Sequence, residues 1–378
     1  MGCESRRFDA GLASEAVIRG REGTLVGPDA EAFTIDPMPM LLGLEEEFFL
    51  IEAGALLPTL QSLDYLRKLY WRQPRDGRTR IASNFARGKD RKLCWMSSVE
   101  VSTHAQPGVD ALIDDLRARR RRVAEASRGA LCAPVGTPLG LDAPSNTAGL
   151  HLHFGVPAAD RDRVYANLGY FLPVLMVASM NSPAYGLPTR AKSYRMACNF
   201  ASGTLVDDRE YRFQDLIVSK RLGTVEIRAL DPVPDLGRLR AIVEAAVAIA
   251  AHPEPLPFDR ERFNAERPHF TVEGLTPWVR DLWERMQPIA PMPIELLEQP
   301  ESDRILAIAE RRSPEEAYLA LDAEWRRDTG VPLELREHRK IRAWTGVLGY
   351  YVPQLPFMAY KGLKEWYGAP PDLSRPHR

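Results

Sequence analysis

Three consecutive glutamates lie inside an otherwise apolar stretch of this chain, "LLGLEEEFFLIE" at residues 41–52. Because successive side chains of a β-strand point to opposite faces, Glu45 and Glu47 share one face and Glu46 points to the other. Two carboxylates on one face repel each other, and each resists burial unless a positive charge lies nearby. The stretch therefore predicts a pair of carboxylates with a cation between them.

Three further strand-like stretches also alternate an apolar face with an ionisable one. They are "SSVEVST" at 97–103, "GLHLHFGV" at 149–156 and "GTVEIRAL" at 223–230. The first presents Glu100, the second places His151 and His153 on one face, and the third does the same with Glu226 and Arg228. Taken alone, each stretch is also typical of a strand that turns its charged side chains toward solvent. Together they predict an antiparallel sheet with one polar side.

If these four strands are neighbours, their polar groups share one surface. That surface would hold Glu45, Glu47, Glu100, His151, Glu226 and Arg228. Several carboxylates with one imidazole favour Mg²⁺ or Mn²⁺ over zinc, and Mg²⁺ usually shares its remaining positions with substrate phosphates. Arg228 would supply a guanidinium fork for one of those phosphates. The residues therefore predict a metal site that takes a phosphorylated substrate.

The order of the patterns along the chain predicts an α+β fold. Strands are expected at 42–51, 94–103, 149–156 and 223–230, and helices at 108–132, 160–181 and 235–251. Residues 1–36 read as an N-terminal extension and 37–378 as a single domain, in which 252–378 form a helical C-terminal portion beside the sheet. In the helix at 108–132, a basic run (Arg117 and Arg119 to Arg122) is expected to be a solvated face, with phosphate contact as the alternative.

Composition limits the partners and the compartment. The 378 residues include 50 basic and 51 acidic side chains, so the net charge of -1 gives no general attraction to nucleic acid or to a membrane. The four cysteines form no CxxC pair, which favours a reducing cytoplasm over a disulfide framework. The longest apolar stretch, 170–180, is too short to span a bilayer and contains Pro173, so a core helix is expected there.

The same stretches carry a resemblance to a known family. In order, "GLEEEFFLIE", "SSVEVST", "GTPL", "GLHLHFGV", "SYR" and "GTVEIRALDPVP" resemble successive signatures of the type 2 glutamate–cysteine ligase family. That family includes the YbdK-like carboxylate–amine ligases and belongs to the glutamine synthetase superfamily. The resemblance covers residues 40–251. It implies a curved, mainly antiparallel sheet with a polar, metal-binding concave face and helices packed on the other face.

The resemblance also implies a reaction and its residues. The reaction is ATP-dependent activation of a carboxylate as an acyl phosphate, followed by amide formation with an amine; a γ-glutamyl bond is one such amide. The implied roles are an outer metal on Glu45, His151 and Glu226, an inner metal on Glu47, Glu100 and an unplaced acidic ligand, nucleotide contact by His153, phosphoryl contact by Arg228, and substrate-carboxylate binding by Arg195. ATP and Mg²⁺ (or Mn²⁺) are the expected cofactors, and a small-molecule carboxylate (an amino acid) and an amine are the expected partners. A homodimer is expected for a separate reason, because symmetric dimers are common among soluble proteins.

Other classes of function remain open from the residues. One is a phosphotransferase that phosphorylates an amine or guanidine and stops there; another is a metal-dependent hydrolase, which the glutamate-rich site disfavours. A noncatalytic binding protein on a ligase fold is a third, although all the implied metal positions are present. The stretch "NSPAYGLPTRAKSYR" at 181–195 departs from the family pattern, so the sequence leaves the identities of the carboxylate and the amine open.

Overall fold

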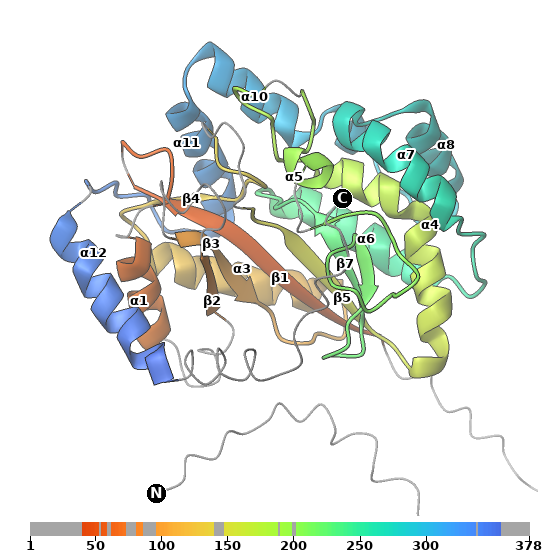
Figure 1. Ribbon diagram of the computed structural model, residues 1–378, viewed down its shortest axis with the longest axis horizontal. Helices are drawn as coiled ribbons and strands as arrows, with labels where there is room; N and C mark the ends of the chain where they lie inside the picture. Colours follow the sequence, from red (N-terminus) through yellow and green to blue (C-terminus); the bar gives the residue numbers. More distant parts are fainter. Residues whose placement is uncertain are drawn as a thin grey trace, which may run out of the picture.

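The computed structural model describes residues 40–52, 54–58, 62–72, 81–85, 96–139, 147–187, 190–198, 202–337 and 339–356. Within these ranges the chain folds as α+β, with one antiparallel sheet through the middle and helices around it (Figure 1). The predicted fold class is therefore confirmed at this level. The N-terminal extension predicted at 1–36 lies outside the described residues.

The described sheet has seven strands in the order β2-β3-β1-β5-β7-β6, with β4 paired to the end of β1. The strands are β1 Leu41–Ile51, β2 Ile81–Phe85, β3 Met96–Ser102, β4 Leu131–Ala133, β5 Leu150–Gly155, β6 Leu216–Val218 and β7 Val225–Leu230. All these pairs are antiparallel. The four strands predicted from alternation (β1, β3, β5 and β7) are confirmed, and they lie side by side as the site required.

The strands β2, β4 and β6 were not predicted. Two of them, β4 and β6, have three residues each, which is too short to show a period-two pattern. The helix predicted over 108–132 ends at Ala126, and Leu131–Ala133 instead pairs with Phe49–Ile51 of β1. The apolar residues of β4 suited either a helix or a strand, so the long-range partner decided between them.

Helices flank the sheet and make up most of the described chain after residue 235. They are α1 Ser62–Arg72, α3 Val109–Ala126, α4 Arg161–Ser179, α5 Tyr194–Cys198, α6 Leu236–Ala251, α7 Arg260–Glu273, α8 Pro277–Met286, α9 Glu295–Glu298, α10 Glu301–Arg311, α11 Pro314–Arg326 and α12 Lys340–Gly346. The helices predicted over 160–181 and 235–251 are confirmed, and α6 begins at a capping residue, Asp235, which accepts from the Arg238 amide. No described helix is long and apolar enough to cross a membrane.

The apolar face of the sheet forms the main core with these helices. Leu42 and Leu44 of β1 are buried together with residues of α4 and α6, and α4 packs along α6. Phe263 of α7 and Val279 of α8 belong to the same buried cluster. Burial of this surface supplies the main driving force for holding the helices on the sheet. The single-domain organisation stays a prediction, supported by this shared core.

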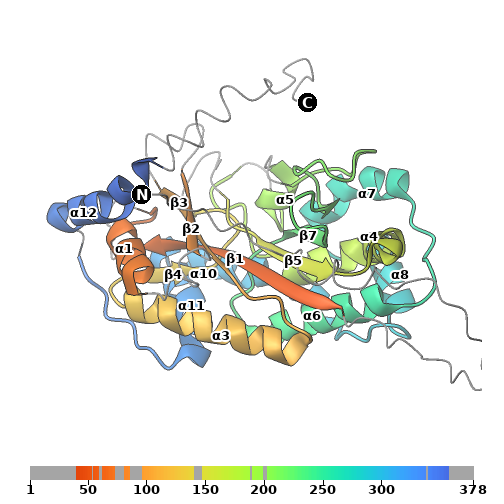
Figure 2. The same cartoon turned by 90° about the horizontal axis from the view of Figure 1, so that it is seen from below.

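The basic run of α3 is only partly a solvated face. Arg121 and Arg122 are exposed, as expected, but Arg119 and Arg120 are buried, so the prediction was wrong for these two. Arg120 lies one turn after the buried Leu116, on the stripe of the helix that faces the sheet. Figure 2 shows α3 lying along β1, beside α6. The charge of Arg120 can be buried because the carboxylate of Glu46 on β1 pairs with it.

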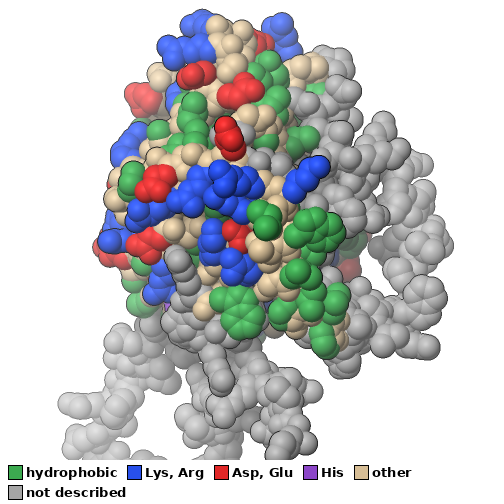
Figure 3. All heavy atoms as spheres, turned by 90° about the vertical axis from the view of Figure 1, so that its left-hand side faces the viewer, with side chains coloured by type: hydrophobic (Ala, Val, Ile, Leu, Met, Phe, Trp, Pro, Cys, Tyr) green, Lys and Arg blue, Asp and Glu red, His purple; other side chains and the backbone are tan. Residues whose placement is uncertain are grey.

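The side of the molecule that carries α1 and α12 displays basic side chains beside a hydrophobic patch (Figure 3). Exposed apolar side chains at the C-terminal end of the described chain are Ile341, Trp344, Leu348, Val352 and Leu355. All but Leu355, which directly follows η5, lie on α12 and on the short helical segments after it, η4 (Val347–Tyr351) and η5 (Val352–Gln354). The homodimer expected from the sequence stays a prediction.

Candidate metal and phosphate site

Strand register brings the predicted polar residues together on one face of the sheet. Glu47 of β1 stands opposite Glu100 of β3, and Glu45 stands opposite His151 of β5. On the other side of β5, His153 stands opposite Glu226 of β7. Directly opposed residues in an antiparallel pair have Cβ atoms roughly 4.5–5.5 Å apart, so side chains from β3, β1, β5 and β7 can meet.

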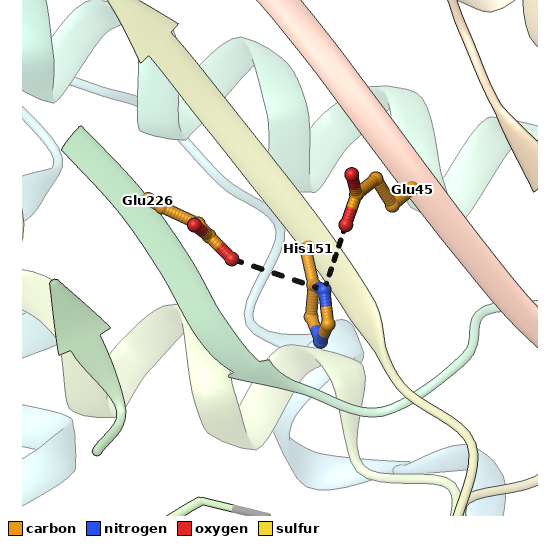
Figure 4. Close-up of side chains that lie close together, drawn as sticks. All are labelled: Glu45, His151 and Glu226. Atoms are coloured by element: carbon orange, nitrogen blue, oxygen red, sulfur yellow. Dashed lines mark hydrogen bonds and ion pairs between the residues drawn. The ribbon is translucent and has the colours of Figure 1, made fainter. Parts of the chain in front are cut away.

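Glu45, His151 and Glu226 converge most closely (Figure 4). The Nδ1 atom of His151 lies 3.2 Å from Glu45 Oε2 and 3.9 Å from Glu226 Oε1. Within the described ranges these three side chains form a group whose ligand atoms all lie within 4.8 Å of one another. They are the three residues that the family resemblance assigned to the outer metal.

The spacing of this group fits a small divalent cation. Mg²⁺ binds oxygen ligands at about 2.1 Å in octahedral geometry, which places ligand atoms roughly 3.0 Å apart when adjacent and roughly 4.2 Å apart when opposite. The two separations from His151 Nδ1, 3.2 and 3.9 Å, are close to the adjacent and the opposite distance respectively. Two carboxylates with one imidazole are also a donor set that Mg²⁺ or Mn²⁺ accepts.

His153 lies between the same two carboxylates. Its Nε2 atom is 3.8 Å from Glu45 Oε2, and its Nδ1 atom is 3.7 Å from Glu226 Oε2 and 3.2 Å from the Thr224 hydroxyl. The Nε2 atom is buried and has no hydrogen-bond partner in the part of the chain that the structure describes. The ring is therefore oriented by its Nδ1 side, and its other nitrogen faces the carboxylate cluster.

The electrostatics of this face are dominated by negative charge. Burial and the neighbouring carboxylates of Glu47 and Glu45 raise the pKa of Glu100 to about 8, although Arg221 and Arg228 oppose the rise. Burial also acts to raise the pKa of Glu45, but the hydrogen bond with His151 and the nearby imidazole of His153 outweigh it and hold that pKa well below the usual range. Since like charges crowd here, a bound cation would relieve the repulsion.

Two further predicted site residues lie at the edges of the cluster. The Glu47 carboxylate accepts a hydrogen bond of 2.7 Å from the amide of Gly149, the residue just before β5. The Arg228 guanidinium bonds the Glu226 carboxylate through Nη1, and its Nε has no hydrogen-bond partner among the described residues. Arg228 is thus held at the cluster by one arm.

Arg195 occupies a different environment. Its side chain, on α5, is buried and donates to the backbone carbonyls of Arg228, Ala229 and Leu230 at 2.9, 2.7 and 3.1 Å. It also lies 3.7 Å from the buried carboxylate of Asp231. Burial raises the pKa of Asp231 to about 6 and lowers that of Arg195. The described contacts hold the end of β7, and the substrate-carboxylate role of Arg195 stays a prediction.

Sequence reasoning missed a buried ion pair directly behind this face. Glu46 points to the helical side, as predicted, and its carboxylate pairs with Arg120 of α3 at 2.5 Å and accepts from the indole of Trp325 on α11 at 3.3 Å. The position of Arg120 within the apolar stripe of its helix was the available signal. Its partner, 74 residues away in the chain, could not be found from that signal.

Comparison with known proteins finds sequence similarity to glutamate–cysteine ligases. No protein-family model matches the chain. The chain is 30% identical over 145 residues to a glutamate–cysteine ligase of Halobacterium salinarum, covering 29% of this chain and 40% of that protein. It is 26% identical over 289 residues to a putative glutamate–cysteine ligase 2-3 of Rubrobacter xylanophilus, covering 62% and 74%. The match thus spans less than half the length of the Halobacterium salinarum relative.

Among solved structures, a bifunctional glutathione synthetase from Pasteurella multocida is similar in fold. The two structures agree with a TM-score of 0.53 over 77% of this chain and 52% of that chain, at 12% sequence identity. At this level of identity the likeness concerns the fold alone. It supports the α+β architecture that the sequence predicted.

Proposed function

Because this chain is a homologue of the glutamate–cysteine ligases, we propose that it is an ATP-dependent carboxylate–amine ligase. Its substrates would be ATP, a small carboxylate such as an amino acid, and an amine, joined as an amide; a γ-glutamyl amide is the family's form of that product. A cytoplasmic location, with access to ATP, is part of the proposal.

The observation that carries the proposal is the group of Glu45, His151 and Glu226, with ligand atoms within 4.8 Å, next to the opposed carboxylates of Glu47 and Glu100. One Mg²⁺ would be held by the first three residues and a second by the other two. Bound Mg²⁺ neutralises charge on the phosphates of ATP and orients them for transfer. The raised pKa of Glu100, about 8, supports a face that is completed by cations.

The residues of the chain would bind and orient the reactants. Arg228, tethered to Glu226 by one arm, would contact the γ-phosphoryl group with the remainder of its guanidinium fork. His153 would face the nucleotide. A carboxylate oxygen of the substrate attacks the γ-phosphorus, the bond to ADP breaks, and an acyl phosphate forms.

In the second step the amine nitrogen attacks the acyl carbon, phosphate leaves, and the amine loses a proton as the amide forms. Neither step needs a nucleophile from the protein. Such chemistry depends on positioning the reactants and on stabilising charge in the transition state. A face rich in charged groups can do both.

The test is ADP and phosphate release from ATP with Mg²⁺, across mixtures of amino acids and amines, with mass spectrometry of the products. Phosphate release that requires both organic substrates, with a condensed product, would support the ligase. A phosphorylated product from a single organic substrate would replace it by a phosphotransferase. Absence of nucleotide binding would refute both.

A further inference from the structure

We propose that Arg120 is a positioning residue for the metal site, acting through Glu46 from the opposite side of the sheet. In this role it ties strand β1 to the segment that follows strand β7, so that the carboxylates of Glu45 and Glu226 stay at metal-binding separation. The inference rests on the proposed function, because it concerns the metal site assigned there.

Arg120 uses both sides of its guanidinium. Nε and Nη2 donate to the two carboxylate oxygens of Glu46, at 3.1 and 2.5 Å, as a bidentate fork. Nη1 donates to the carbonyl of Pro234 at 2.6 Å, and Nη2 also donates to the carbonyl of Val233 at 2.7 Å. One fully buried side chain thus bonds β1 and the loop after β7 at the same time.

These two anchor points adjoin the two outer strands of the metal group. Glu46 follows Glu45 directly, whereas Val233 and Pro234 come shortly after β7 ends at Leu230. In the sheet, β1 and β7 are not neighbours, because β5 lies between them. At roughly 4.8 Å per strand, their backbones are roughly 9.6 Å apart, and their carboxylates must converge over β5 to share one ion.

The hydrogen bonds of the sheet alone hold the carboxylates of Glu45 and Glu226 together only weakly. The pairing of β5 with β7 changes register between Leu150 and Leu152, beside His151. A register irregularity disrupts the ladder of hydrogen bonds locally and lets a strand bend. A tie from the helical side that spans both β1 and the loop after β7 would limit that movement, and the bonds of Arg120 have this span.

A buried ion pair often adds little net stability, so the presence of Arg120 and Glu46 in the core calls for a role other than stabilisation. Desolvation of both charges opposes their attraction, and apolar replacements of similar volume are often tolerated. Another buried arginine serves as a comparison: Arg326 of α11 pairs with Asp322 at 2.7 Å and donates to the carbonyls of Ala124, Ser127 and Ala130. It ties α11 to the end of α3 and to β4, without touching β7 or the loop after it.

The experiment measures Mn²⁺ binding to the full-length protein by calorimetry, together with thermal unfolding, for wild type, Arg120→Lys and the matched control Arg326→Lys. Lysine keeps the charge but cannot reproduce the fork or reach all the acceptors. We expect Arg120→Lys to weaken Mn²⁺ binding by at least about tenfold, the usual effect of losing a group that orients metal ligands. Arg326→Lys should change it by less than about twofold, whatever its effect on the melting temperature.

If Arg120→Lys does not fold, Glu46→Gln decides by the same thresholds, because it keeps the shape of the side chain and removes only the charge. Equal Mn²⁺ affinity in wild type and the Arg120→Lys or Glu46→Gln protein would overturn the inference and leave the metal site intact. Equal weakening in the Arg326→Lys control would also overturn it, since a general loss of stability would then account for the effect. A wild-type protein that binds no Mn²⁺ would overturn the metal site itself.

Discussion

Strand β1 presents glutamates to both faces of the sheet, and the two faces balance the charge in different ways. On the helical side, the buried carboxylate of Glu46 is paired with Arg120 and bonded by Trp325. On the polar side, Glu45 and Glu47 adjoin Glu100, whose pKa is raised to about 8. The negative charge of Glu46 is thus balanced by a cation of the protein itself. Carboxylates that face one another instead favour an added cation, which is the physical basis of the proposed metal site.

The largest expected effect concerns the helical side. Replacing Arg120 by methionine leaves the Glu46 carboxylate buried without its cation, and breaking a buried pair in this way costs about 3–5 kcal/mol of the free energy of unfolding. Urea unfolding of Arg120→Met and of the double variant with Glu46→Leu measures it. The double variant should recover much of the loss, and failure to recover would mean that the charge pair is not the source.

The next effect concerns the polar side. Glu100→Gln should lower ATP turnover at least about 100-fold, comparable to the loss of one charge-stabilising group in other active sites. The free energy of unfolding at neutral pH without metal should rise, because the unfolded chain ionises Glu100 whereas the raised pKa keeps it largely protonated in the fold, and glutamine removes that penalty. ADP release and urea unfolding test the two halves. Full turnover in the Glu100→Gln protein would remove Glu100 from the proposed site.

The polar face should make the stability of the protein depend on pH. Folding raises the pKa of Glu100 from 4.5 to about 8, so the folded state holds this proton more tightly than the unfolded state does. Its contribution to stability is fully present below about pH 4.5 and is lost as the pH rises through about 8. Melting temperatures from pH 5 to 9 without metal should show this fall. Mg²⁺ or the Glu100→Gln substitution should flatten it, and an unchanged slope in the Glu100→Gln protein would assign the titration to another group.

The smallest effect separates the two kinds of arginine on α3. Arg121 forms an exposed pair with Glu125 at 3.3 Å, one residue from the buried Arg120. Exposed pairs of this kind contribute little, so Arg121→Ala should change the free energy of unfolding by less than about 0.5 kcal/mol. The same unfolding assay measures it beside Arg120→Met. A loss comparable to that of Arg120→Met would show that burial is not what distinguishes the two.

Much of the polar face could be predicted because alternation is a local property. The types and spacing of Glu45, Glu47, Glu100 and Glu226 were enough to assign these side chains to the non-core sides of their strands. The resemblance to a ligase family then suggested that the four strands are neighbours. The short strands β4 and β6 could not be found in this way, because three residues carry no period.

The burial of Arg120 could not be predicted with the same means. A run of arginines on a helix is typically solvated, and the sequence offers no measure of the desolvation cost that a particular partner will offset. In the structure, the partners of this guanidinium come from residues 74 and more than 100 positions away.

The sequence by itself determined which side chains of each long strand share a face, because the direction of a side chain in a strand depends only on its position in the alternation. It also determined the chemical character of the face, an excess of carboxylates with two imidazoles and a guanidinium. The tertiary structure decided which of these groups meet. Strand order and register placed Glu45 opposite His151, 106 residues apart, and the packing of α3 beneath β1 gave Glu46 its cation. Such pairings depend on contacts between segments far apart in the chain. The free energy of those contacts cannot be predicted from a local sequence pattern.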